Sequence, residues 1–197
     1  MVEKMAMPRP TPYLRSITLV LAAAAAMLAV HARASNLPDA VLEGDYGLQP
    51  VGAGELRWLG RPIYRASLWT PAGNFTGYQP GEPVALSLSY QREFSRDELL
   101  RITATAWRLL DSTPPGQRER WLAALRTFWA DVGPGDNVTT VVVPGSATRF
   151  YDHRGFMGEI ADPAFGPAFL SIWLDSRSVV GDLRVQLLGL ERSAARR

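Results

Sequence analysis

The chain has no cysteine and little histidine, and these absences exclude several chemistries. Its 197 residues include two histidines, of which His153 is the one that follows residue 34. Without a thiol there is no cysteine nucleophile, thiolate metal site or iron–sulfur cluster. We therefore expect neither a metal site nor a bound cofactor. Stability must come from a packed core, which a chain of this size is able to build.

Two motifs of common enzyme classes are also missing. The sequence contains neither the G-x-G-x-x-G of dinucleotide-binding folds nor the G-x-S-x-G of α/β-hydrolases. Asp152 precedes His153, and such a pair invites a general-base interpretation. Adjacent residues on a strand point to opposite faces, however, so Asp152 is poorly placed to orient His153. The sequence therefore predicts no catalytic residues.

The N-terminus has the pattern of an export signal. Basic residues precede an alanine-rich apolar stretch at residues 17–30, and Ala32-Arg33-Ala34 has the small residues of a cleavage site. A membrane anchor is the alternative, but the apolar stretch is shorter than the roughly 20 residues of a spanning helix. We interpret residues 1–34 as a Sec-type signal peptide cleaved near Ala34. The mature protein is then expected to be periplasmic or secreted, without a stable membrane span.

The leader also distorts the charge balance. The chain carries 21 Lys and Arg residues against 19 Asp and Glu residues, and residues 1–34 hold four of the basic and one of the acidic residues. The mature chain therefore has a net charge of about −1 and no block of basic residues. We interpret residues 191–197 as a solvated basic tail. No nucleic-acid partner is expected.

Short segments of alternating apolar and polar residues predict strands. After an irregular lead-in at residues 35–45, one domain spans residues 46–190. Gly52-Ala53-Gly54 is expected to form a turn, and residues 71–83 a long loop. The predicted strands lie at residues 46–51, 55–59, 62–70, 84–91, 138–143, 147–153 and 156–160. Tight turns join most neighbours, so these strands must pair antiparallel.

Helical patterns separate and follow the strands. Ser95 and Glu98 form a capping-box pattern that begins a helix at residues 95–110, and a second helix is expected at residues 117–132. Two shorter helices follow Asp162-Pro163. The buried stripe of the first helix is predicted at Leu99, Ile102, Ala106 and Leu109, with Trp107 and Leu110 beside it. This order indicates an α+β fold with helices on one face of an antiparallel sheet.

Several segments, in this order and spacing, resemble the bacterial chalcone isomerase-like family of exported proteins. The resemblance runs from about Gly47 to Gly189 and is strongest in the block GEI-x-DPAF…IWLD. The segments that carry it are GAGELRWLGRPIYRASLW, PVALSLSY, the Gly135-Asp136 turn, RFYDHRGFMGEI, DPAFGPAFLSIWLD and DLRVQLLG. It implies an open-faced sandwich, in which a large antiparallel β-sheet is covered on one face by a layer of α-helices with a ligand cleft between them.

The catalytic residues of the plant enzyme are only partly matched. That enzyme places an arginine after a GAGER-like turn, a threonine on the next strand, and a Tyr/Asn pair on a helix. Arg57 corresponds to the arginine, but no threonine precedes Thr70 on the next strand. Residues 95–110 contain neither Tyr nor Asn. Flavonoid isomerisation is therefore not expected.

The superfamily also includes fatty-acid-binding proteins that hold a carboxylate with arginine and tyrosine. The resemblance then implies a small apolar ligand such as a fatty acid, its chain held by apolar burial and its carboxylate by paired charge-assisted hydrogen bonds. The predicted ligand-binding residues are Arg57, Tyr64, Tyr90 and Trp107, with either tyrosine as the phenolic donor. Trp107 lies beside an apolar stripe, where lining a cleft and forming a core are hard to separate.

The sequence is also compatible with two other functions. One is an isomerase or lyase that acts on an unsaturated carbonyl compound, with Arg57 as electrostatic stabiliser and a tyrosine as acid. The other is a protein-interaction module that contacts an envelope partner through Phe75 and Tyr78 in the long loop. The sequence identifies no particular protein partner.

Overall fold

Six strands that pair in sequence order form the sheet of the described chain. The structure is a computed structural model that describes residues 37–111 and 113–190. The predicted signal peptide and basic tail lie outside these residues. Every neighbouring pair is antiparallel. The strands are β1 (Gln49–Trp58), β2 (Arg61–Thr70), β3 (Val84–Tyr90), β4 (Asn137–Val142), β5 (Thr148–Asp152) and β6 (Gly155–Ile160).

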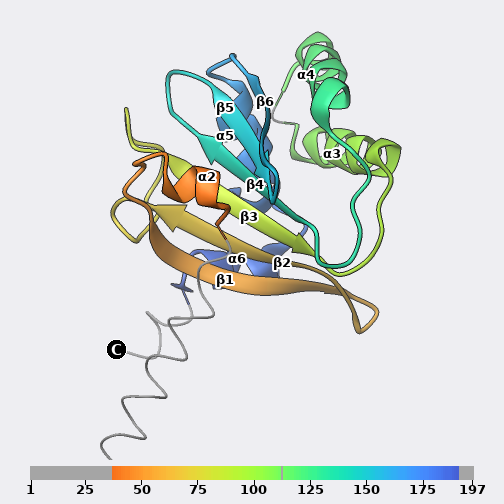
Figure 1. The fold of residues 1–197 in the computed structure, drawn as a ribbon. Coiled ribbons are helices and arrows are strands. Elements are labelled where there is room, and N and C mark those ends of the chain that lie inside the picture. The colour runs from red at the N-terminus through yellow and green to blue at the C-terminus, as the bar shows by residue number, and fades with distance from the viewer. Residues whose placement is uncertain (1–36, 112, 191–197) are drawn as a thin grey trace, which may run out of the picture. The chain divides into compact units, whose positions relative to one another are not determined.

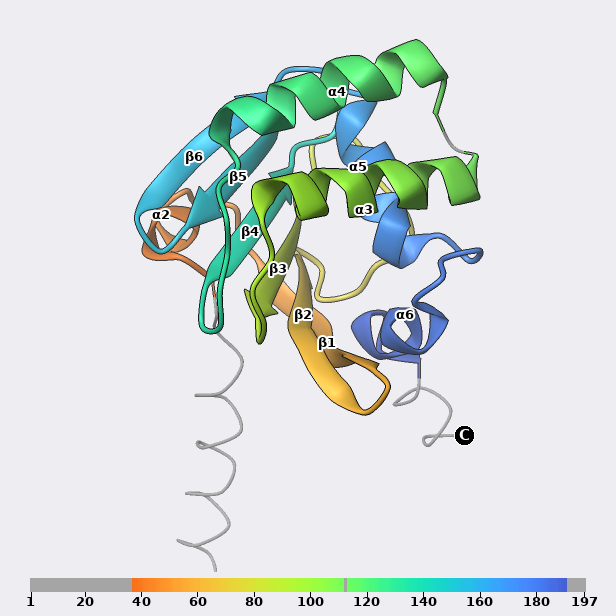
Figure 2. The same cartoon turned by 90° about the vertical axis from the view of Figure 1, so that its right-hand side faces the viewer.

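Helices pack mainly against one face of this sheet, as Figures 1 and 2 show. The helices are α2 (Asp39–Leu42), α3 (Arg96–Leu110), α4 (Pro115–Phe128), α5 (Phe165–Leu174) and α6 (Gly181–Leu187). The α+β prediction of a large antiparallel sheet covered on one face by helices is confirmed. Among the described residues, no helix is both long enough and apolar enough to span a bilayer.

Alternate strand residues enter two separate cores. Leu68, Leu86 and Phe150 face α3, α4, α5 and α6 in the main core. Their sequence neighbours Trp69, Ala85 and Tyr151 face the other side, where Leu37 and Val41 cover them. The lead-in expected to be irregular therefore contains the single-turn helix α2 and covers the second face. A helix this short leaves no periodic pattern to detect.

The predicted turn at Gly52-Ala53-Gly54 was wrong, because these residues continue β1. Gly52 and Gly54 lie beneath α6, and a Cβ atom at Gly52 would overlap the backbone carbonyls of Gln186 and Leu187. A Cβ atom at Gly54 would overlap the Gln186 side chain. Glycine in a strand often marks such a close approach of another element. These glycines therefore let α6 rest directly on the sheet.

The helix α3 begins at the predicted cap but buries a face rotated from the predicted stripe. The Ser95–Glu98 capping box is present. The buried residues are Leu100, Thr103, Ala106, Trp107 and Leu110. Ile102 and Leu109 are exposed. The Trp107 Nε1 donates a hydrogen bond of 2.8 Å to the Ala168 carbonyl of α5. This bond, together with burial of the large indole, sets the rotation of the helix.

The helix α4 ends four residues earlier than predicted. Its last residue is Phe128, and the Trp129 backbone is already extended. Val132 and Phe94 exchange two backbone hydrogen bonds of 2.9 Å each. Pairing with Phe94 requires extended backbone at Val132, so the helix must end before it.

Candidate functional site

A cleft of about 540 Å³ lies between the sheet and the helices. All six strands contribute residues to its floor, and its walls come from α3, α5, the residues after α4 and the loop before α6. Most side chains that line it are apolar. They include Leu56, Ile63, Leu88, Phe94, Ile102, Val138, Met157, Phe169, Ile172 and Val180. A volume of this size lies within the range of roughly 300–1,000 Å³ typical of small-molecule sites.

Tyr64 and Tyr90, both predicted site residues, line this cleft together. They are register partners on β2 and β3, with ring centroids 6.3 Å apart. Burial raises the pKa of Tyr64 to about 12, although its hydrogen bond with Trp173 acts in the opposite direction. Burial and the neighbouring Tyr64 also raise the pKa of Tyr90. Both phenols are therefore protonated hydrogen-bond donors at neutral pH, and poor acids.

The Tyr64 hydroxyl is oriented by α5. It accepts a hydrogen bond of 2.9 Å from the Trp173 Nε1. A tyrosine hydroxyl both donates and accepts, so this contact leaves its own proton available. Tyr64 is accordingly prepared to donate to an oxygen atom in the cleft.

Arg57, the predicted clamp for an acidic head group, lies outside the cleft. Leu56 and Trp58 line the cleft, and side chains alternate along a strand. Arg57 therefore points to the opposite face, where its guanidinium donates to the Glu55 carboxylate and the Gly60 carbonyl. Burial alone would raise the pKa of Glu55, but hydrogen bonds from Gln91, Arg57 and Arg65 lower it. Arg57 thus belongs to an ion-pair network on the outer face.

Trp107, the fourth predicted ligand residue, lies in the core instead of in the cleft wall. Its side chain is fully buried and is not among the residues that line the cleft. Its ring contacts Trp121, Phe165 and Phe169 at centroid distances of 5.6–6.5 Å. Trp107 therefore supports the helix layer behind the cleft.

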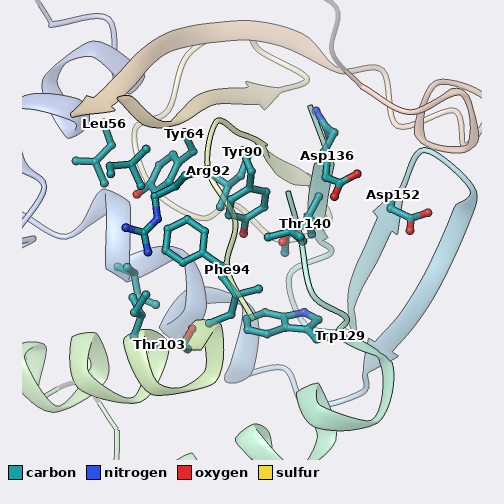
Figure 3. Close-up of a pocket in the computed structure, with 18 of the residues that line it drawn as sticks. Leu56, Tyr64, Tyr90, Arg92, Phe94, Thr103, Trp129, Asp136, Thr140 and Asp152 are labelled. Carbon is teal, nitrogen blue, oxygen red and sulfur yellow. The ribbon is translucent and has the colours of Figure 1, made fainter. Parts of the chain in front are cut away.

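Two arginines line the cleft, Arg92 and Arg154. Arg154 is ion-paired with Asp152, and Arg92 is the one beside Tyr64. It follows β3, and its guanidinium carbon lies 4.1 Å from the centre of the Phe94 ring. Figure 3 shows it beside Tyr64 and Phe94. Among the described residues, no carboxylate lies within ion-pair distance of Arg92. Arg92 therefore makes no ion pair with the described residues, although its charge adds to the hydrogen bonds from Ser95 in lowering the pKa of Glu98.

Trp129 provides a second hydrogen-bond donor at the cleft that has no acceptor among the described residues. It lines the cleft, and its Nε1 is buried without any hydrogen-bond partner. The ring is held by Phe150 and Phe169, with centroids 6.0 and 6.1 Å away. A buried donor without an acceptor costs about 1–3 kcal/mol. An acceptor atom on a bound molecule would remove that cost.

The opposite end of the cleft carries acidic residues. Asp136 and Asp152 lie far from Arg92 in Figure 3. Asp136 accepts a 2.7 Å hydrogen bond from the Gly133 amide. Asp152 accepts from the Arg154 amide and guanidinium at 2.6–2.9 Å. Arg154 lines this end as well and offsets the charge of Asp152, so the excess negative charge there comes from Asp136.

Asp152 also supplies a pH-dependent contribution to stability. Burial alone would raise its pKa, but the hydrogen bonds from Arg154 outweigh burial and hold the pKa below the ordinary value of 3.8. The contribution is therefore fully present above the unfolded pKa of about 3.9, and it is lost as the pH falls through the folded pKa. We expect Asp152→Asn to lower the free energy of unfolding at neutral pH by about 1–3 kcal/mol.

Urea unfolding of both proteins at neutral pH and in acid measures this effect. The difference between them should shrink as the acidic solution protonates Asp152. Glu159→Gln is the matched control, because the Arg149–Glu159 pair is exposed and such pairs contribute about 0–1 kcal/mol. A difference for Asp152→Asn that does not change with pH would contradict the assignment.

The long loop does not present its aromatic residues freely. Phe75 and Tyr78 are partly buried against the main core, and their ring centroids lie 5.3 Å apart. The Tyr78 hydroxyl is buried without a partner. These two residues therefore pack into the fold rather than stand out as a contact surface.

Arg92 and Trp129 were not among the predicted site residues, and only one of them leaves a sequence signal. Arg92 is in phase with the apolar stripe Val84, Leu86, Leu88 and Tyr90, so continued alternation places it on the cleft side. Trp129 leaves no such signal, because its position depends on where α4 ends.

In the described residues, no group of three or more His, Asp or Glu side chains converges as a metal site would require.

Comparisons with known proteins relate the chain to one family. The sequence model described as chalcone isomerase-like matches residues 29–189. An uncharacterized protein of Haemophilus influenzae is 26% identical over 148 residues, covering 74% of this chain and 70% of that protein. The crystal structure of a fatty-acid binding protein of Arabidopsis thaliana superposes with a TM-score of 0.53, covering 77% of this chain and 91% of that chain. At 9% identity, this last likeness establishes the fold alone.

Proposed function

The chain belongs to the chalcone isomerase-like family, and from this premise we propose that it is a non-catalytic binding protein for an apolar molecule with an acidic or carbonyl head group, such as a fatty acid. The observation that carries the proposal is the cleft of about 540 Å³ between sheet and helices, apolar except for a few polar groups. The fatty-acid binding activity named for the Arabidopsis protein of similar fold supports it.

The polar groups of the cleft suit one orientation of such a ligand. A carboxylate beside Arg92 and Tyr64 would accept charge-assisted hydrogen bonds, which are about twice as strong as neutral ones. The other end, where Asp136 and Asp152 outnumber Arg154, is less favourable for a carboxylate. The apolar chain would then extend past Phe94 toward Phe169. Trp129 offers its Nε1 to an acceptor atom on a ligand that carries one there.

The same groups argue against acid catalysis by the tyrosines. Efficient general acids have a pKa near the operating pH, whereas burial raises the pKa of Tyr64 to about 12 and that of Tyr90 as well. Arg57, which would stabilise a developing negative charge in the isomerase or lyase alternative, faces away from the cleft. Binding without turnover is therefore the better account of this site.

Export is part of the proposal and is supported by the sequence pattern of residues 1–34. Fractionation of the host cells, with detection of the protein in the periplasm or medium and determination of its N-terminus, tests this part. Processing near Ala34 is the expected result, and an unprocessed cytoplasmic protein would contradict it.

Binding is tested by native mass spectrometry of protein purified from its host, followed by titration with saturated fatty acids of increasing length. We expect a co-purifying lipid. Affinity should rise about fourfold per added methylene, since each buried methylene contributes about 0.8 kcal/mol, until the cleft is full. An empty protein that binds no fatty acid of any length, or one that turns over an enone, would overturn the proposal.

Two arginine variants separate the cleft from the outer face. Arg92→Ala should weaken fatty-acid binding tenfold or more, because a charge-assisted hydrogen bond contributes about 1.5–3 kcal/mol. Arg57→Ala is the matched control and should change the dissociation constant less than twofold. Calorimetric titration of both variants with one fatty acid measures the difference. Equal losses in the two variants would remove Arg92 from the site.

A further inference from the structure

The hairpin between β1 and β2 ends in two exposed apolar residues. Trp58 and Leu59 leave 71% and 89% of their surface exposed. Figure 1 shows the hairpin extending beyond the end of β3. Single exposed apolar residues are ordinary on protein surfaces. Here, however, two adjacent ones occupy the end of a projecting element.

The backbone at this hairpin tip is strained by its leucine. Leu59 and Gly60 have φ values of 48° and 77°, so both central residues of this two-residue turn lie in the left-handed region. Such turns favour Asn or Asp before Gly, and a side chain without their local hydrogen bonds costs about 1–2 kcal/mol there. The exposed Leu59 side chain gains no burial in return. The stability of the fold therefore does not explain a leucine at this position.

The hairpin tip adjoins the opening of the cleft. Trp58 lines the cleft, as do Ile102 of α3 and Val179 of the loop before α6. All three side chains are exposed as well. Apolar residues from three separate elements therefore edge one opening, and the hairpin tip extends that edge outward.

The surroundings of the hairpin tip are positively charged. The hairpin itself carries three arginines and one glutamate, a net charge of +2; they are Arg57, Arg61, Arg65 and Glu55. Glu55 is shared between Arg57 and Arg65. Within the described residues, Arg61 has no carboxylate within ion-pair distance.

We propose that the hairpin tip docks the protein on an anionic phospholipid bilayer. Trp58 and Leu59 enter the interfacial layer, where tryptophan is favoured, and the arginines contact lipid phosphates. The cleft then opens toward the membrane, so that an apolar ligand passes between bilayer and cleft without crossing water. That transfer step rests on the proposed function, whereas the membrane contact does not.

Flotation with vesicles tests the contact. The probes are vesicles of phosphatidylcholine alone and of phosphatidylcholine with phosphatidylglycerol, used with the full chain as its host processes it. We expect binding to the anionic vesicles only. Binding should weaken with added salt, because the screening length falls from about 10 Å at 0.1 M to about 3 Å at 1 M ionic strength.

The variant Leu59→Asn with Arg61→Ala isolates the hairpin tip. Neither residue lines the cleft, and asparagine suits the turn, so the fold should be kept. Losing one arginine near an anionic surface weakens binding about fivefold, and losing the leucine adds a further severalfold loss. We therefore expect at least a tenfold fall in the partition coefficient. Phe156→Thr, which removes an exposed ring from the opposite edge strand β6, should change it less than twofold.

Three results would overturn the docking proposal. The first is equal binding to neutral and anionic vesicles, and the second is unchanged vesicle binding of the hairpin-tip variant. The third is a dimer in sedimentation that this variant abolishes, because a second copy of the chain would then cover the hairpin tip. Fatty-acid affinity measured without vesicles keeps the two proposals apart. The hairpin-tip variant should retain it, whereas Arg92→Ala should lose it.

Discussion

Trp107→Ala is expected to lower the free energy of unfolding by about 3–5 kcal/mol, as large-to-small changes at buried aromatic residues do. The indole is fully buried and contacts Trp121, Phe165 and Phe169. Its loss opens a cavity between α3 and α5. It also leaves the Ala168 carbonyl without the donor that now lies 2.8 Å away.

Chemical denaturation followed by circular dichroism measures this loss without depending on tryptophan fluorescence. Trp58→Ala is the matched control, because Trp58 is largely exposed and surface substitutions usually change stability by less than about 0.5 kcal/mol. Trp107→Phe should fall between the two, since it keeps part of the ring volume and loses the donor. A Trp107→Ala protein that kept its stability and lost only ligand binding would restore Trp107 as a ligand residue.

Gly52→Val is expected to destabilise the protein by about 3 kcal/mol, at the upper end of the usual cost of overpacking. The first added carbon would overlap the backbone carbonyls of Gln186 and Leu187. No side-chain rotation relieves a clash with backbone atoms. The helix α6 must therefore move away from β1, and Val180, which precedes α6 and lines the cleft, would move with it.

Ala53→Val is the control for this prediction. Ala53 is the exposed neighbour of Gly52 on β1, and valine suits a strand better than alanine. Thermal unfolding of both variants, together with fatty-acid titration, measures the two effects. Gly52→Val should lose stability and affinity, whereas Ala53→Val should keep both. Equal melting temperatures for Gly52→Val and the parent protein would contradict the close contact of α6 with β1.

Local patterns predicted most of the fold. The alternation along β3 and the Ser95–Glu98 capping box depend on residues close together in the chain, and both features are present. The order of strands and helices identified the α+β class and the family resemblance. The errors involve distant contacts. Glycines beneath α6 resemble a turn in sequence, and the end of α4 depends on pairing between Val132 and Phe94.

The residues of the candidate site also fall into those that local patterns predict and those that depend on distant contacts. Tyr64 and Tyr90 were identified from sequence and both line the cleft. Arg57 does not, although the same alternation that places Leu56 and Trp58 in the cleft accounts for its outward direction. Arg92 continues the alternation of β3, so the same reasoning places it on the cleft side. That reasoning does not place Trp129, because its direction depends on the residue at which α4 ends.

The sequence by itself determined the family, the antiparallel sheet with its helix layer, and the types of side chain available for binding. These follow from local periodicity, capping and segment order. Only the tertiary structure decided which tryptophan lies in the core and which lines the cleft, and that Trp58 and Leu59 project at the cleft opening. The reason is physical. The contacts of these side chains depend on helix rotation and on where distant elements touch, and both are set by residues far apart in the sequence.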